Sequence, residues 1–139
     1  MEINASIILK KNKEVSVLRR HPWIFSGAVH STRGNPVSGD WVNIYDSHNN
    51  FLAAGHYQDA NICARILSFE PVTPNPDFWI KKLGNAMEFR KQMGLPNSHT
   101  NAFRLVFGEG DELPGLVVDL YDKTAVMQAH SLGMFADRQ

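Results

Sequence analysis

The chain has 139 residues, of which 43% are hydrophobic and 20% charged, and its 14 basic residues balance 14 acidic ones. This composition excludes an intrinsically disordered chain, because such chains combine few hydrophobic residues with a high net charge. The longest apolar run, Phe51 to Ala54, is far shorter than the roughly 20 residues of a membrane span or the roughly 7–15 of a secretory signal. The single cysteine, Cys63, can form no internal disulfide and no cysteine-based zinc site, which favours the reducing cytoplasm.

The neutral total hides two segments of opposite charge. Residues 10–34 carry six basic residues and one acid, Glu14, whereas residues 107–122 carry five acids and no base. Local fields of this kind steer charged partners even in a neutral chain, although a solvated surface is the simpler interpretation of either segment. The basic residues are Lys10, Lys11, Lys13, Arg19, Arg20 and Arg33, and the acidic ones are Glu109, Asp111, Glu112, Asp119 and Asp122.

The first seventy residues have the pattern of a small β unit. Alternating apolar and polar residues predict a strand over 3–10, and Asn12 can cap a short helix with Val15 and Leu18 on its apolar side. That helix must end near His21, because Pro22 disfavours the helical conformation in the preceding residue. Short strands with frequent turn signals predict a small closed β-barrel. The further predicted strands are 23–29, 41–45, 51–57 and 62–69.

A boundary between two units is predicted near Glu70. Pro71, Pro74 and Pro76 form a stiff linker there, and we assign residues 1–72 to a first domain and 73–139 to a second. A helix follows the linker, with Asn75 as its N-cap, apolar residues at helical spacing, and an end at Gly94 and Pro96.

The remaining residues again have the pattern of strands. Strands are predicted over 103–107, 115–120 and 124–130, with a tight turn at 121–123 between the last two. One helix and three strands make a thin core, and residues 133–139 carry no stop signal of a finished domain. We therefore expect an incomplete second domain and a chain that is the N-terminal portion of a longer protein.

The histidines and the cysteine do not indicate a metal or catalytic site. None of the six histidines lies three or four residues from another, so the paired spacing of a helical zinc site is missing. Cys63 falls on a predicted strand, with no neighbouring base or cation to activate it. A small buried thiol is the expected role of Cys63.

The acidic segment contains Gly108 and Gly110 in the spacing G-x-G. The third glycine and the following helix of a dinucleotide site are missing, and the neighbouring carboxylates would repel a phosphate. Two interpretations stay open: a loop that binds a cation, and a rigid turn that offers hydrogen-bond acceptors to a neighbouring domain.

The basic N-terminal segment is therefore the best candidate site. Its positive side chains flank the predicted short helix, and His21 and Trp23 could stack on a nucleobase. Burial in a strand is the simpler interpretation of Trp23 and Phe25, so the prediction depends on the charges. The segment favours an RNA-binding barrel whose phosphate contacts weaken with salt.

Two long runs resemble a known family. Leu18 to Val29, LRRHPWIFSGAV, resembles the N-terminal PUA domain of class I S-adenosylmethionine (SAM)-dependent RNA methyltransferases similar to ribosomal RNA large subunit methyltransferase I. Shorter matches support this run at Ser38-Gly39-Asp40, Ala54-Gly55-His56-Tyr57 and Arg65-Ile66-Leu67-Ser68. Residues 101–119, NAFRLVFGEGDELPGLVVD, resemble the α/β segment that connects the PUA domain of this family to its catalytic domain.

The resemblance implies a mixed β/α chain, in which a PUA-like small β-barrel is followed by a helix and a partial antiparallel sheet. It also implies a cytosine C5 methyltransferase for large-subunit ribosomal RNA, whose C-terminal Rossmann-like domain binds SAM and presents the catalytic cysteine. In that chemistry a thiolate adds to C6 of cytosine and a base later removes the C5 proton. No catalytic, cofactor-binding or metal residue is assigned to this chain, and the RNA-contact candidates are Lys10, Lys11, Lys13, Arg19, Arg20, His21 and Arg33.

We therefore expect a cytoplasmic, non-catalytic part of an RNA methyltransferase that positions RNA. SAM would bind to the full-length protein and not to this fragment. The expected partners are RNA, the protein's own methyltransferase domain and a second copy of the chain. Two alternatives stay open: a stand-alone, non-enzymatic PUA protein that binds RNA, and a protein-interaction barrel whose basic patch binds an acidic partner.

Overall fold

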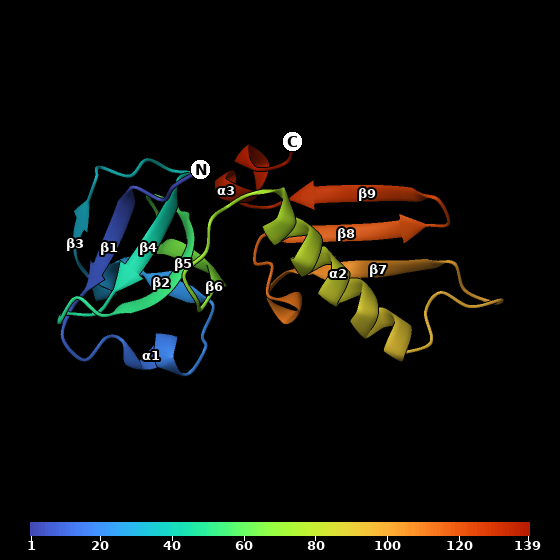
Figure 1. Ribbon diagram of the computed structural model, residues 1–139, viewed down its shortest axis with the longest axis horizontal. Coiled ribbons are helices and arrows are strands. Elements are labelled where there is room, and N and C mark those ends of the chain that lie inside the picture. Colours follow the sequence, from blue (N-terminus) through green and yellow to red (C-terminus); the bar gives the residue numbers. More distant parts are fainter.

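The computed structural model describes all 139 residues and shows a curled β unit joined to a unit of one long helix and a small sheet (Figure 1). Short helices, α1 and α3, lie below the curled unit and between the two units, respectively. None of the helices combines the length and the apolar character that a membrane span needs. The elements of the first unit are β1 (Ala5–Leu9), α1 (Val15–Leu18), β2 (Trp23–Phe25), the 3₁₀ turn η1 (Ser26–Ala28), β3 (Val29–Arg33), β4 (Trp41–Tyr45), β5 (Phe51–Tyr57) and β6 (Ile62–Ser68). Those of the second are α2 (Pro76–Gln92), β7 (Ala102–Phe107), the 3₁₀ turn η2 (Gly108–Asp111), β8 (Leu116–Tyr121), β9 (Thr124–Ala129) and α3 (Leu132–Ala136).

The first unit is a six-stranded sheet in the order β2-β6-β5-β4-β1-β3. Neighbouring strands are antiparallel except β1 and β4, which run parallel. The two edge strands, β2 and β3, are consecutive in the chain, so the sheet must curl until η1 can join its edges. The predicted fold class is confirmed, with a curled half-barrel in place of a fully closed barrel.

The interior of this half-barrel is filled by the inward residues of its neighbouring strands. Ile7, Val42 and Ile44 are fully buried on β1 and β4, and the residues of β5 opposite Val42 and Ile44 are small. Gly55 on β5 is one such position, because a Cβ atom there would overlap the backbone of Arg65 on β6. The close approach of β5 and β6 therefore requires glycine.

Two predicted details of the first unit are wrong. The single predicted strand 23–29 is two strands, because η1 interrupts it where the chain passes from one sheet edge to the other. In α1 the buried residue is Val17, whereas Leu18 is 68% exposed and Asn12 lies outside the helix in a left-handed turn. A helix of only four residues faces the barrel with a single side chain, so the expected apolar side of Val15 and Leu18 does not form.

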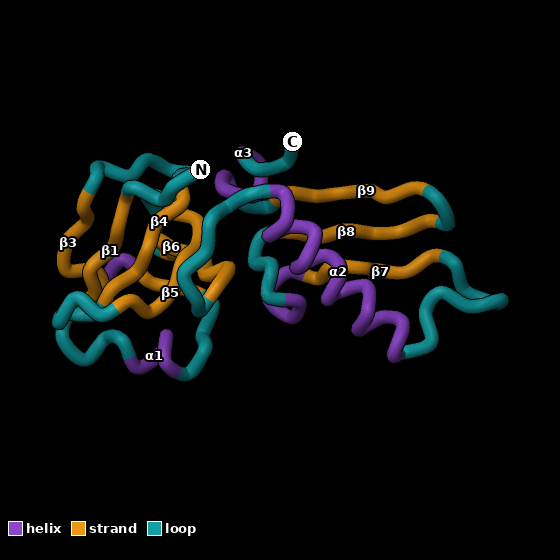
Figure 2. The backbone as a smooth tube through the Cα atoms, viewed as in Figure 1, coloured by secondary structure: helices purple, strands orange, loops and turns teal.

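The second unit packs α2 against the antiparallel sheet β7-β8-β9 (Figure 2). The side chain of Asn75 accepts a hydrogen bond from the Phe78 N–H at 2.9 Å, which confirms the predicted N-cap. The helix ends at Gln92, and Gly94 follows with a positive φ of 83°. The predicted strands agree with β7, β8 and β9 to within a residue or two.

The second core is shared between the two units. Besides residues of α2, α3 and the small sheet, it contains Trp41, Ala54 and Leu67 from the outer face of β4, β5 and β6. The Trp41 ring meets Phe78 edge-on, with 5.5 Å between centroids. The second unit is therefore built on the outer face of the first. The domain boundary at residue 72 stays a prediction of the sequence.

Candidate RNA interface

The basic side chains around α1 line an open cleft of about 940 Å³, named here the α1 cleft. Lys13, Arg19, Arg20 and His21 contribute to its walls, and no acidic residue does. Such a cleft concentrates positive potential without a competing carboxylate, as a phosphate-binding surface requires. The other lining residues are Asn12, Val15, Ser16, Pro22, Phe25, Gly27 and Ala28.

Three aromatic rings lie together beside the α1 cleft. The ring centroids of His21, Trp23 and Phe25 are 6.0–6.4 Å apart. The expected burial of Trp23 and Phe25 is wrong: Phe25 is 50% exposed, Trp23 is half-buried, and only Ile24 points inward. β2 is an edge strand, so alternation places one of its three side chains in the core and leaves the other two on the surface. Exposed rings next to cations can stack on unpaired bases.

Arg20 is held at the edge of the α1 cleft by the end of helix α1. Its backbone has a positive φ of 62°, and its N–H donates to the Val17 carbonyl at 2.9 Å. The guanidinium lies over the Phe69 ring at 4.8 Å from the centroid. A positive φ is uncommon for a residue other than glycine, and here it accompanies a side chain that lies over Phe69, the residue after β6.

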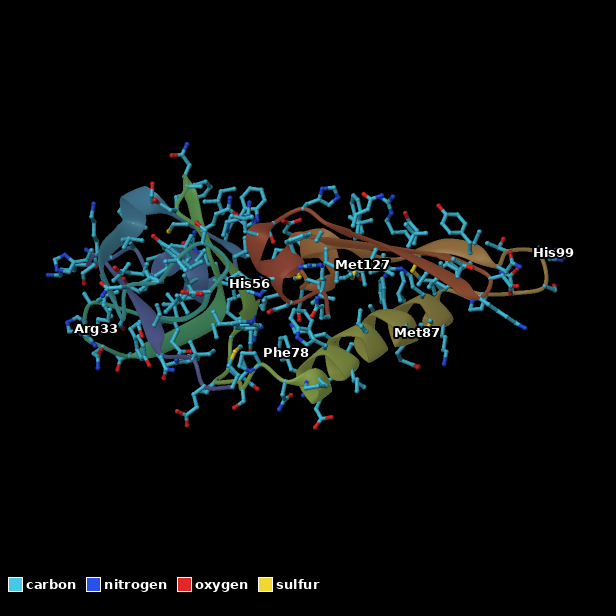
Figure 3. All side chains as sticks on the ribbon, turned by 90° about the horizontal axis from the view of Figure 1, so that it is seen from above. Arg33, His56, Phe78, Met87, His99 and Met127 are labelled. Atoms are coloured by element: carbon cyan, nitrogen blue, oxygen red, sulfur yellow. The ribbon has the colours of Figure 1, made fainter.

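The other predicted RNA contacts lie farther away. Lys10 and Lys11 are exposed in the loop before α1, and the Lys10 N–H donates to the carbonyl of Ala28, a residue that lines the α1 cleft. Arg33 lies at the outer end of the first unit (Figure 3), where it donates to Asn49 Oδ1 at 3.1 Å. The fold thus gathers Lys13, Arg19, Arg20 and His21, leaves the two lysines at the margin, and separates Arg33 from the group.

The acidic segment around η2 forms a rigid turn that binds other parts of the chain. The Arg90 guanidinium donates to both oxygens of Asp111, at 3.0 and 2.8 Å, and the pair is largely buried. Glu109 Oε1 accepts from Trp23 Nε1 of the first unit at 3.1 Å. This bond supports the second of the two interpretations above, a turn that offers acceptors to a neighbouring domain. No three histidine, cysteine or acidic side chains are gathered as metal ligands.

Lys82 and Glu112 form a weaker contact between α2 and the same turn. Lys82 Nζ lies 3.4 Å from Glu112 Oε2. Burial lowers the pKa of Lys82, and the neighbouring Glu112 carboxylate opposes this effect in part. Glu112 has a positive φ of 58°, which turns the chain toward β8.

Cys63 has the structural role expected from the sequence. It is 5% exposed, and its thiol donates to the Ile24 carbonyl at 3.4 Å. Burial raises the pKa of the Cys63 thiol to about 11. At neutral pH the thiol is protonated and cannot act as a nucleophile.

A contact between His56 and Asp137, which the sequence did not predict, joins the two units. Asp137 Oδ2 lies 2.8 Å from His56 Nε2 and accepts from Trp41 Nε1 at 2.7 Å, so the segment after α3 is bound to β4 and β5. His56 is 3% exposed and labelled at the centre of Figure 3. The only sequence signal was the motif Ala54-Gly55-His56-Tyr57, and nothing in it indicates Asp137 as the partner.

Comparisons with known proteins show what the first unit and the longer chain are similar to. Residues 7–69 match the family model of the PUA-like domain. Over the aligned residues, the chain is 36% identical to ribosomal RNA large subunit methyltransferase I of Alteromonas mediterranea and 41% identical to the protein of that name in Aeromonas hydrophila. Both alignments cover 94% of this chain and 33% of the relative, so the chain spans about a third of the length of these curated relatives. The resemblance inferred from the sequence is confirmed.

Solved structures show the same fold. A protein from Streptococcus mutans, described as a SAM-dependent methyltransferase, matches with a TM-score of 0.79 and 19% identity, over 96% of this chain and 35% of its own. A second structure, described as a methyltransferase complexed with SAH, has the same TM-score and identity and covers 34% of its own chain. Both structural matches contain the arrangement of a PUA-like unit and a helix-and-sheet unit across nearly all of this chain.

Proposed function

We propose that this chain is the RNA-positioning part of a SAM-dependent methyltransferase that modifies large-subunit ribosomal RNA in the cytoplasm. The names of the relatives and the PUA-like domain support the RNA methyltransferase class. The observation that carries the proposal is the α1 cleft, which is lined by Lys13, Arg19, Arg20 and His21 without an acid, beside the half-buried Trp23 and the exposed Phe25.

In this proposal the chain holds RNA and leaves the methyl transfer to other residues. Cationic side chains of the α1 cleft bind phosphates, which sets the register of the RNA, while the exposed rings stack on unpaired bases. Cys63 does not fit the role of a nucleophile, because its pKa of about 11 keeps it protonated. The glycine-rich turn η2 is occupied by contacts within the chain, because the Arg90 guanidinium donates to both oxygens of Asp111 there.

The first test measures RNA binding by the chain itself. We expect a fluorescently labelled single-stranded RNA to bind with an affinity that falls as salt rises, by a log–log slope of about 0.7 per phosphate contact. The double variant Arg19→Glu, Arg20→Glu should weaken binding more than about tenfold, because it reverses two charges of the α1 cleft. Fluorescence anisotropy between 50 and 200 mM salt measures both effects.

A matched control carries the same charge change at a distance from the α1 cleft. Lys91 and Lys123 are exposed on the second unit, and Lys91→Glu with Lys123→Glu should weaken binding far less. Because Arg20 also packs on Phe69, the pair Lys13→Glu, Arg19→Glu is a second test that leaves this packing intact. Equal losses in the cleft and control variants would argue against the α1 cleft. Absence of RNA binding would favour the protein-interaction alternative.

The second test concerns the reaction of the whole enzyme. A protein that contains this chain and a catalytic domain should transfer a methyl group from SAM to C5 of a cytosine in large-subunit ribosomal RNA. Mass spectrometry of the digested RNA should then detect 5-methylcytidine. Methylation of another base would contradict the cytosine assignment, and no methylation would contradict the enzyme assignment.

The association of two copies of the chain into a homodimer also stays a prediction. Analytical ultracentrifugation of the same protein would measure its oligomeric state.

A further inference from the structure

A second cleft, of about 470 Å³, lies between the two units and is named here the inter-unit cleft. Arg20 and Pro22 line both clefts, so the inter-unit cleft begins where the α1 cleft ends. Its volume is within the roughly 300–1,000 Å³ range of small-molecule sites. The other lining residues are Ile66, Leu67, Ser68, Phe69, Glu70, Val72, Phe78, Lys81, Lys82, Asn85, Glu109, Gly110 and Glu112.

The two clefts differ in charge, so one suits a phosphate and the other suits a neutral base. The inter-unit cleft has three cations, Arg20, Lys81 and Lys82, and three carboxylates, Glu70, Glu109 and Glu112. Its lining is therefore neutral, whereas the α1 cleft has cations only. A phosphate is attracted to the α1 cleft, whereas the neutral lining of the inter-unit cleft offers it no net electrostatic attraction. A neutral group with hydrogen-bonding edges fits the inter-unit cleft better.

The inter-unit cleft also offers flat surfaces for a ring. The Arg20 guanidinium lies over Phe69 at 4.8 Å from the ring centroid, and Lys82 Nζ lies 5.8 Å from the centroid of Phe78. Guanidinium planes and aromatic rings are the surfaces on which proteins stack unpaired bases. Arg20 lines both clefts and is placed where a nucleotide would pass from one to the other.

Unused acceptors face the same space. Glu109 uses only Oε1, to bind Trp23, and Glu112 uses only Oε2, beside Lys82. The second oxygen of each carboxylate has no partner within the chain. Ionised carboxylates are acceptors only, so they can bind amino groups of bases but repel carbonyl oxygens. The exposed Asn85 on α2 adds an amide to the same wall.

We propose that the inter-unit cleft binds an unpaired nucleobase of the RNA whose phosphates occupy the α1 cleft, and that it prefers a base with an exocyclic amino group. The proposal rests on the RNA-binding function proposed above and adds a base-selective site to it. Cytosine and uracil are the sharpest pair for a comparison, because cytosine carries an amino donor at the position where uracil carries a carbonyl acceptor.

The experiment compares labelled octamers of cytidine and uridine by fluorescence anisotropy with the 139-residue chain. We expect the cytidine octamer to bind about tenfold more tightly, since one good base-edge contact discriminates between bases by about that factor. In Glu109→Gln, Glu112→Gln the ratio should fall to about threefold or less, because each new amide can donate to uracil. Removal of two negative charges strengthens the binding of both octamers, so the ratio of the two affinities is the measured quantity.

A control variant makes the same chemical change outside the cleft. Glu2 and Glu88 are exposed and line neither cleft, so Glu2→Gln with Glu88→Gln should keep the tenfold ratio. Should the double cleft variant fold poorly by circular dichroism, Glu112→Gln alone serves in its place, since that side chain is 70% exposed.

The outcomes separate this proposal from the proposed function. Equal affinity of the unchanged chain for both octamers, or a preference that survives in the cleft variant, would overturn the base site. In either case, salt-dependent RNA binding that is lost in the double variant Arg19→Glu, Arg20→Glu would still support the RNA-binding function. If neither octamer binds, both the base site and the RNA-binding function are wrong.

Discussion

Burial sets the chemistry of Cys63, the one thiol in the chain. The residue lies on β6 in the core of the half-barrel, next to β2, and is 5% exposed. No charged group contributes to its pKa, so no opposite charge stabilises a thiolate there. The pKa of the thiol is therefore raised from about 9 to about 11. The protonated form is the more stable one in the folded chain, so Cys63 behaves as a small apolar residue with a weak donor.

This pKa predicts slow alkylation of the folded chain. At pH 8 the fraction of thiolate should be about a hundredfold lower than in the unfolded chain, and burial adds a further decrease in rate. Because the folded pKa is raised, the contribution of Cys63 to stability is complete below about pH 9 and is lost as pH rises to about 11. Reaction with iodoacetamide, with and without urea, measures the difference. Equal rates in the two conditions would contradict the burial of this thiol.

Two helices of the second unit each contain a glycine, and their surroundings are opposite. Gly84 of α2 has no atom within 4 Å of the position that a Cβ would occupy. Gly133 of α3 lies directly against His56, whose ring a Cβ would overlap. The short helix α3 can reach His56 and β5 only because residue 133 lacks a side chain.

Substitution of these two glycines by alanine should therefore change stability in opposite directions. Gly84→Ala should raise the free energy of unfolding by up to about 1 kcal/mol, because alanine favours the helix. Gly133→Ala should lower it by about 2 kcal/mol, because the added methyl group pushes α3 away from His56. Urea denaturation measures both values, and Gly84→Ala is the matched control. Stabilisation by Gly133→Ala would show that α3 does not dock on His56.

At the scale of the whole molecule, the second unit uses the first as part of its core. Trp41, Ala54 and Leu67 of the curled sheet are buried by the helix-and-sheet unit. Trp41 also donates to Asp137, a residue 96 positions later in the chain. Loss of either unit would expose apolar surface of the other, so the two should unfold together.

Two probes test this cooperative unfolding, each in a different unit. Circular dichroism at 222 nm follows mainly α2, the one long helix, which belongs to the second unit. Accessibility of Cys63 to a thiol reagent follows the first unit. Both signals should change at the same urea concentration, and Trp41→Ala should shift both midpoints downward together. Two separate transitions would contradict a shared core.

Much of the candidate site could be predicted from the sequence. The charge pattern indicated the α1 cleft, because Lys13, Arg19, Arg20 and His21 are close together along the chain. Arg33 was predicted with them and lies elsewhere, since β3 carries it to the outer end of the unit. The positions of Trp23 and Phe25 outside the core could not be predicted, because the sequence does not show that β2 is an edge strand.

The sequence alone indicated most of the strands, the long helix and the resemblance to ribosomal RNA methyltransferases. Strand alternation, proline and glycine signals, and the Asn75 cap are local, so they predict β4 to β9 and α2 before any packing is known. The tertiary structure decided which faces are buried and which residues meet across the two units. Trp23 and Glu109 lie 86 residues apart, and His56 and Asp137 lie 81 apart. Contacts at such separations arise only when both units are folded, because no local pattern relates one partner to the other.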